Sequence, residues 1–113
     1  MKQFDIAVIA GDGIGPEVTA EELKVLDAAA DVYGFKLTYR QYPFGSEHYF
    51  KTGDIFPDQA FEEVKGLDAI LLGAIGDPRA PVGLIEYGVI AKLRFELDLY
   101  INLRPIKVFD ERL

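Results

Sequence analysis

The sequence predicts an α/β fold in which strands and helices alternate around a largely parallel sheet. Two short apolar runs, over residues 4–10 and 67–73, predict buried strands, because each is rich in aliphatic residues; glycine follows the first run and ends the second. Apolar residues at helical spacing lie between these runs. Strands separated by helices normally pair in parallel through crossover connections. We expect residues 1–113 to form one unit.

The first half of the chain follows this alternation. Pro16 suits the first turn of a helix that carries apolar residues at helical spacing, and Gly34 ends it. Residues 35–42 alternate between apolar and polar side chains, which predicts a half-exposed strand. A short helical turn is expected over residues 47–51, and a helix from Pro57 that Gly66 closes.

The second half adds a long loop, a helix and a further predicted strand. The helix is expected over about residues 84–97, with one apolar stripe for the core and a second stripe that includes Glu86, Ile90 and Arg94. Residues 99–104 alternate again and predict a strand. Its apolar residues would face a core, and its polar residues, including Arg104, would face a ligand. Pro105 would end the strand or place it at an edge.

Composition excludes several classes of protein. The formal net charge is −7, so the chain repels nucleic acid and anionic membranes. The absence of cysteine excludes a disulfide-stapled module and a thiolate zinc site. We find neither a signal peptide nor an apolar run long enough to span a membrane, so we expect a cytoplasmic protein. His48 is the only histidine, which favours packing over metal binding.

Two glycine-rich loops are the candidates for ligand binding. Residues 11–15 and 73–83 each follow a predicted buried strand. In open α/β sheets ligands gather beyond the carboxyl ends of the strands, so the two loops should share one edge. The first loop opens a helix but lacks the dinucleotide-binding fingerprint, because Pro16 stands where the third glycine belongs. A plain glycine turn without a ligand is the alternative for both loops.

Arg94 and Arg104 are the candidates for binding an acid. Each guanidinium can hold a carboxylate through two parallel hydrogen bonds, so the pair would suit a small molecule with several carboxylates. Ordinary surface ion pairs are the alternative. Asp77, Glu86 and Asp98 are candidate functional carboxylates, with capping or solvated roles as the alternative.

Three stretches together carry a resemblance to a known family. They read AGDGIGPEV over residues 10–18, LLGAIGDP over residues 71–78, and LRFELDLYINLRP over residues 93–105. In this order and spacing they resemble the decarboxylating dehydrogenases of β-hydroxy acids, which include the 3-isopropylmalate, isocitrate, homoisocitrate and tartrate/D-malate enzymes. The resemblance is greatest to the 3-isopropylmalate enzymes of leucine biosynthesis.

The resemblance implies roles for particular residues. Arg94 and Arg104 match arginines that clamp the substrate carboxylates, and Ile90 matches a position that touches the γ-substituent of the substrate. Ile14 matches a residue near the adenine of NAD. The remaining cofactor contacts would lie at the nicotinamide end, in the loop Gly73, Ala74, Ile75, Gly76 and Asp77 and at Glu86. Many members carry their acidic residue at the position of Tyr87, so Glu86 is here the nearest carboxylate.

The resemblance also implies a longer protein. Family chains extend well beyond this length, and their catalytic residues and their ligands for Mg²⁺ or Mn²⁺ lie in the part that would follow Leu113. The chain would then be the N-terminal part of the large domain of a homodimeric, NAD-dependent oxidative decarboxylase of a small-molecule substrate, inactive alone and without catalytic or metal-binding residues. A tartrate/D-malate dehydrogenase and a non-catalytic binding or assembly module are the alternatives.

Overall fold

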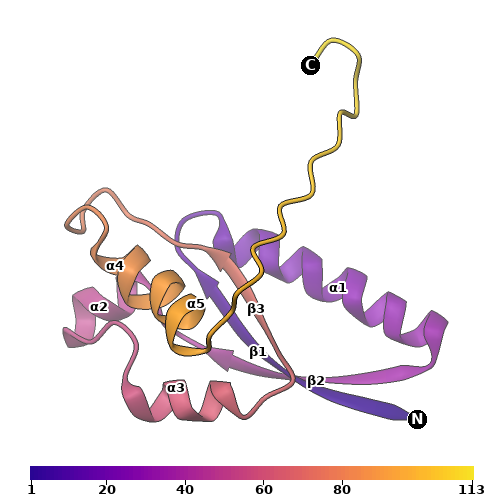
Figure 1. Cartoon of the computed structure of the whole chain (residues 1–113), viewed down its shortest axis with the longest axis horizontal. Helices are drawn as coiled ribbons and strands as arrows, with labels where there is room; N and C mark the ends of the chain where they lie inside the picture. Colours follow the sequence, from indigo (N-terminus) through magenta and orange to yellow (C-terminus); the bar gives the residue numbers. More distant parts are fainter.

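A computed structural model describes all 113 residues and centres on a parallel sheet of three strands (Figure 1). The strands are β1 (Lys2–Gly11), β2 (Phe35–Tyr42) and β3 (Ala69–Ala74), in the order β2-β1-β3. In the register, Ile6 of β1 lies opposite Tyr39 of β2 and Ala69 of β3. The predicted α/β class with parallel pairing is therefore confirmed.

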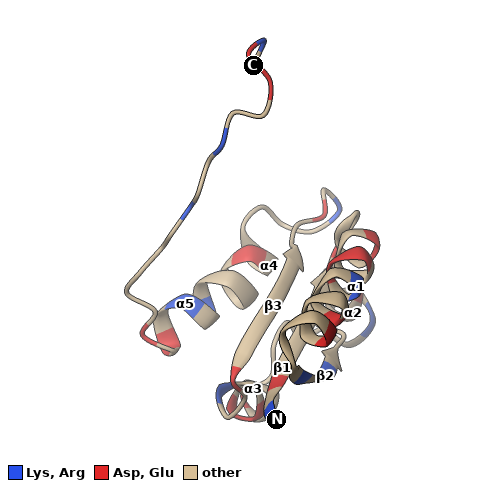
Figure 2. Cartoon of the chain, turned by 90° about the vertical axis from the view of Figure 1, so that its right-hand side faces the viewer, with Lys and Arg blue, Asp and Glu red and all other residues tan.

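Helices cover both faces of the sheet. α1 (Gly15–Tyr33) lies on one face, and Figure 2 shows it opposite the helix that leads from α4 to α5. That second helix consists of α4 (Leu84–Glu86), a π-helical turn η1 (Tyr87–Ala91) and α5 (Lys92–Glu96). It shares its face with α3 (Asp58–Lys65), and α2 (Ser46–Thr52) begins near the carboxyl end of β1. None of these helices has both the length and the apolar character that crossing a bilayer requires.

The main core lies between the sheet and the second helix. Ala7 and Ile9 of β1 are fully buried there, because alternate residues of a strand face the same side. Ile85, Val89 and Leu93 supply the helix side of this core, as their spacing of four residues predicts. Aromatic residues from the connecting segments and α3 complete it, namely Phe44, Phe56 and Phe61.

The C-terminal segment, residues 97–113, contradicts one prediction. No strand forms over residues 99–104, and Leu99, Ile101 and Leu103 are 52%, 71% and 81% exposed instead of facing a core. In Figure 1 the segment runs away from the sheet toward the C-terminus. A strand needs a neighbouring strand that accepts its backbone hydrogen bonds. Residues 99–104 have none, because the Leu99 N–H donates back to the Arg94 carbonyl of α5 and no strand lies beside them, so the alternating pattern produces only an extended chain.

Candidate functional site at the carboxyl edge of the sheet

β1 and β3 end side by side, which brings the two glycine-rich loops together. Gly11 lies opposite Ala74 in the register, and the backbone N–H of Asp12 donates to the carbonyl of Ala74 at 2.6 Å. Ile14 is exposed on the first of these loops, just before α1. The prediction that the two loops share one edge of the sheet is confirmed.

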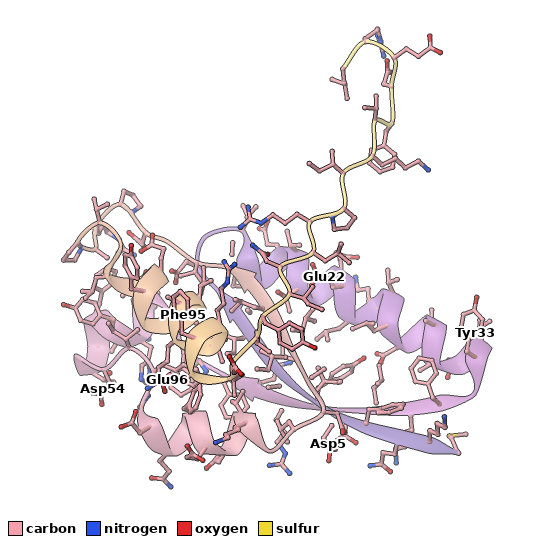
Figure 3. All side chains as sticks on the ribbon, in the orientation of Figure 1. Asp5, Glu22, Tyr33, Asp54, Phe95 and Glu96 are labelled. Carbon is pink, nitrogen blue, oxygen red and sulfur yellow. The ribbon has the colours of Figure 1, made fainter.

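A pocket of about 270 Å³ lies along the second helix. As the predicted stripe requires, Glu86, Ile90 and Arg94 lie on one wall, although the helix widens into the π-helical turn η1 between them. Tyr87, Ala91 and Phe95 also line the pocket, and Phe95 projects from α5 in Figure 3. π-helical turns are rare and occur frequently at functional sites, which directs attention to this wall.

Gly76 connects the second loop to this pocket. Residues other than glycine rarely adopt its backbone φ of +135°. A Cβ atom at this position would lie 3.1 Å from Oε1 of Glu86. The loop backbone and the Glu86 carboxylate therefore face each other with little space between them. Two groups of residues that the resemblance assigns to the cofactor, the loop Gly73–Asp77 and Glu86, meet at this point.

Two charged side chains on the pocket wall have no partner. Neither the Glu86 carboxylate nor the Arg94 guanidinium forms a hydrogen bond or an ion pair with another residue. The partly buried Glu86 carboxylate can contact a positively charged group, and the exposed Arg94 guanidinium can contact an anion. Ile90 lies between them on the same helix face and can contact an apolar group.

Arg104 lies elsewhere. It is an exposed residue of the C-terminal segment, outside the residues that line the pocket, and it forms no ion pair. The structure therefore brings Arg94 together with Ile90 and Glu86 but does not bring Arg104 to them. Its role in binding remains a prediction, because the strand that would have positioned it does not form.

Asp77 is engaged with Arg79. The Arg79 backbone N–H donates to Oδ1 at 2.8 Å, and its guanidinium donates to both carboxylate oxygens, at 3.0 Å from Nε to Oδ1 and 2.7 Å from Nη2 to Oδ2. These hydrogen bonds lower the pKa of Asp77 to about 2. The same guanidinium bonds Glu47 of α2 and lies 4.8 Å from the centroid of the Phe50 ring. The loop after β3 is therefore attached to α2 on its outer side.

Asp12 and Ser46 are functional candidates that sequence reasoning missed. The buried Asp12 carboxylate accepts hydrogen bonds from the backbone and hydroxyl of Ser46 and from the backbone of Gly76. The available indication was an acidic residue between two glycines directly after a buried strand. Nothing in the sequence pairs Asp12 with Ser46, which lies 34 residues away.

Metal-ion ligands do not gather in this chain. No group of three or more His, Cys, Asp or Glu side chains is placed to hold a metal ion. His48 packs its ring edge-on against Phe44, with 5.2 Å between the centroids.

Comparison with known proteins decides the family. The model of the isocitrate/isopropylmalate dehydrogenase family matches residues 5–113, which is nearly the whole chain. The chain belongs to the isocitrate/isopropylmalate dehydrogenase family. The resemblance stated from the three sequence stretches is thereby confirmed.

Curated relatives within this family are 3-isopropylmalate dehydrogenases. The enzyme of Mycolicibacterium vanbaalenii is 57% identical over 104 residues, which cover 92% of this chain and 30% of that enzyme. The enzyme of Streptomyces griseus is 52% identical over 108 residues, covering 96% of this chain and 31% of that enzyme. The chain thus spans about 30% of the length of the relatives it matches.

A solved structure has the same fold. A β-decarboxylating dehydrogenase from Thermococcus kodakarensis in its apo form superposes with a TM-score of 0.67 at 33% identity. The superposition covers 86% of this chain and 27% of that one. The isocitrate/isopropylmalate dehydrogenase family therefore accounts for both the sequence and the fold.

Proposed function

We propose that this chain is the N-terminal part of an NAD- and metal-dependent enzyme that oxidises and decarboxylates 3-isopropylmalate. The wall formed by Glu86, Ile90 and Arg94 carries the proposal, because it presents groups suited to cofactor and substrate on one helix face. The names of the curated relatives support the choice of substrate.

Arg94 and Ile90 would contact the substrate. The unpaired Arg94 guanidinium suits a malate carboxylate, which it can hold through two parallel hydrogen bonds. Ile90 offers only apolar atoms to the γ-substituent, which favours an isopropyl group over the carboxylate of isocitrate. An apolar contact of this size is worth about 1–3 kcal/mol of discrimination. Arg104 would supply a second guanidinium if its segment acquired a neighbouring strand.

The cradle between Gly76 and Glu86 fits the nicotinamide end of NAD. A side chain at Gly76 would fill this space, and the Glu86 carboxylate is free to lie near a positively charged ring. When bound, NAD accepts the hydride that leaves C2 of the hydroxy acid. Gly73, Ala74, Ile75 and Asp77 would form the rest of that loop, and the exposed Ile14 would lie near the adenine.

The residues of this chain do not fit the metal ion. Since no set of side chains is placed to hold Mg²⁺ or Mn²⁺, we assign no step through a metal to these residues. We expect no turnover by the 113-residue chain with 3-isopropylmalate, NAD and Mg²⁺, because it offers only one wall of a substrate pocket and no set of side chains that holds the metal ion.

A hybrid enzyme tests the proposal. The matching 104 residues of the Mycolicibacterium vanbaalenii enzyme would be replaced by those of this chain, and NADH formation measured. We expect turnover with a preference for 3-isopropylmalate over D-malate. Ile90→Ser should reduce that preference about tenfold in kcat/KM, whereas Ile90→Leu should retain it. A folded hybrid that forms no NADH, or that prefers D-malate, would contradict the proposal.

A further inference from the structure

A single buried carboxylate joins three segments that lie far apart in the sequence. Asp12, which is 6% exposed, follows β1, whereas Ser46 begins α2 and Gly76 lies in the loop after β3. Oδ1 of Asp12 accepts a hydrogen bond from the Ser46 backbone N–H at 2.7 Å. Oδ2 accepts one from the Ser46 hydroxyl at 2.7 Å and one from the Gly76 backbone N–H at 2.9 Å.

These three donors compensate the buried charge without a cation. A buried carboxylate is tolerated only when hydrogen bonds replace its hydration, and bonds to an ionised acceptor are stronger than neutral ones. The backbone also approaches closely, since a Cβ atom on Gly45 would lie 2.7 Å from Oδ1 of Asp12. The carboxylate is therefore held tightly and its removal leaves several donors without a partner.

Gly76 transmits this arrangement to the pocket. Its backbone N–H is held by Asp12, and the place where its side chain would lie is bounded by the Glu86 carboxylate. A displacement of Gly76 therefore changes the space in front of Glu86. The position of the cradle depends on the hydrogen bond from Gly76 to Asp12.

The outer attachment of the same loop is weaker. Arg79 joins Asp77 to Glu47 of α2, but Arg79 and Glu47 are both largely exposed. Exposed ion pairs are screened by salt and contribute little, whereas buried hydrogen bonds to a charge are not screened in this way. The buried attachment through Asp12 is the one that can fix the loop.

We propose that Asp12 is a positioning residue that fixes the loop Gly73–Pro78 against the start of α2 and thereby sets the width of the Gly76–Glu86 cradle. That this cradle receives the nicotinamide end of NAD rests on the proposed function. The positioning itself does not, and the two parts are tested separately.

Amide hydrogen exchange in the chain without ligands tests the positioning. In Asp12→Asn the Gly76 amide should exchange about tenfold faster or more, because its charged acceptor is lost, while the amides of Val8 and Ile9 stay within twofold. Asp31→Asn, an exposed charge change on α1, is the control and should alter neither. Unchanged exchange at Gly76 in Asp12→Asn would overturn the proposal.

Ser46→Ala covers the case in which Asp12→Asn unfolds the chain. It removes one donor to Asp12 but keeps both the carboxylate and the Gly76 bond, so Gly76 should exchange about twofold to fivefold faster. Exchange at Gly76 identical to the parent chain would show that α2 and the loop are not coupled through Asp12, and would overturn the proposal.

Kinetics of the hybrid enzyme test the role of the cradle. Asp12→Asn should raise the KM for NAD about tenfold and leave the KM for 3-isopropylmalate within twofold, a separation that general destabilisation does not produce. Equal changes in both constants, or none, would overturn the assignment of the cradle to the cofactor. An inactive parent hybrid would contradict the proposed function, and amide exchange would still decide the positioning.

Discussion

Ile9 in β1 and Leu103 in the C-terminal segment both belong to stretches that the sequence predicts to be strands, yet their surroundings are opposite. Ile9 is completely buried between the sheet and the second helix, whereas Leu103 is 81% exposed. β1 has a hydrogen-bonded strand on each side, and residues 97–113 have no neighbouring strand. Alternation thus determines which side chains share a face, but a strand forms only where another strand completes its hydrogen bonds.

The largest expected effect comes from the core of the packed region. Ile85→Ala removes a fully buried side chain and should lower the free energy of unfolding by about 2–5 kcal/mol, as measured by urea denaturation. Leu103→Ala, the matched change in the C-terminal segment, should alter it by less than about 0.5 kcal/mol. Equal losses for the two variants would show that the C-terminal segment packs in solution.

A smaller effect separates two copies of the same local motif. Asp77 with Arg79 and Asp110 with Arg112 form the same hydrogen bonds two residues apart, and each arginine lowers the pKa of its aspartate to about 2. Only the first motif is also joined to another element, through Glu47. Asp77 should therefore contribute stability that is present above pH 4 and is lost as the pH falls through 2.

Urea denaturation between pH 2 and 5 checks this prediction. Asp77→Asn should flatten the loss of stability in that range, since the folded state no longer favours an ionised carboxylate there. Asp110→Asn should leave the pH profile unchanged, because its motif touches only its own segment. A profile that responds to Asp110 would indicate that the C-terminal segment contacts the rest of the chain.

The smallest effect is expected on removal of residues 99–113. These residues share one backbone hydrogen bond with the rest of the chain, from the Leu99 N–H to the Arg94 carbonyl of α5, so the midpoint of urea unfolding should stay within experimental error of the intact chain. The slope of the transition should also change little, because it follows the surface exposed on unfolding. A clear fall in the midpoint would contradict the exposed position of the segment.

Local patterns were sufficient to predict most of the fold. Proline and glycine residues at the helix ends predicted α1 and α3. The spacing of four residues predicted that Ile85, Val89 and Leu93 share the buried face of the second helix. The same period predicted that Ile90 and Arg94 share a wall. These features depend on residues within one or two turns of each other, which periodicity describes directly.

Contacts between distant residues were not predictable in this way. The hydrogen bonds of Asp12 to Ser46 and Gly76 join residues 34 and 64 positions apart, and no periodicity relates them. The strand expected at Arg104 failed for the same reason, because its existence depends on a neighbour that a local pattern does not specify. The part of the site made by local spacing was thus found, and the part made by tertiary contacts was not.

On the pocket wall, the π-helical turn at Tyr87–Ala91 makes the number of residues between Glu86 and Arg94 as important as their identities. Each residue of an ordinary helix rotates the next by about 100°, so one codon gained or lost between Glu86 and Arg94 would re-aim the arginine unless the turn absorbed it. A π-helical turn absorbs one such residue within its own length. Insertions and deletions that this turn does not absorb would therefore change which ligands the wall accepts during evolution, while both charged side chains stay the same.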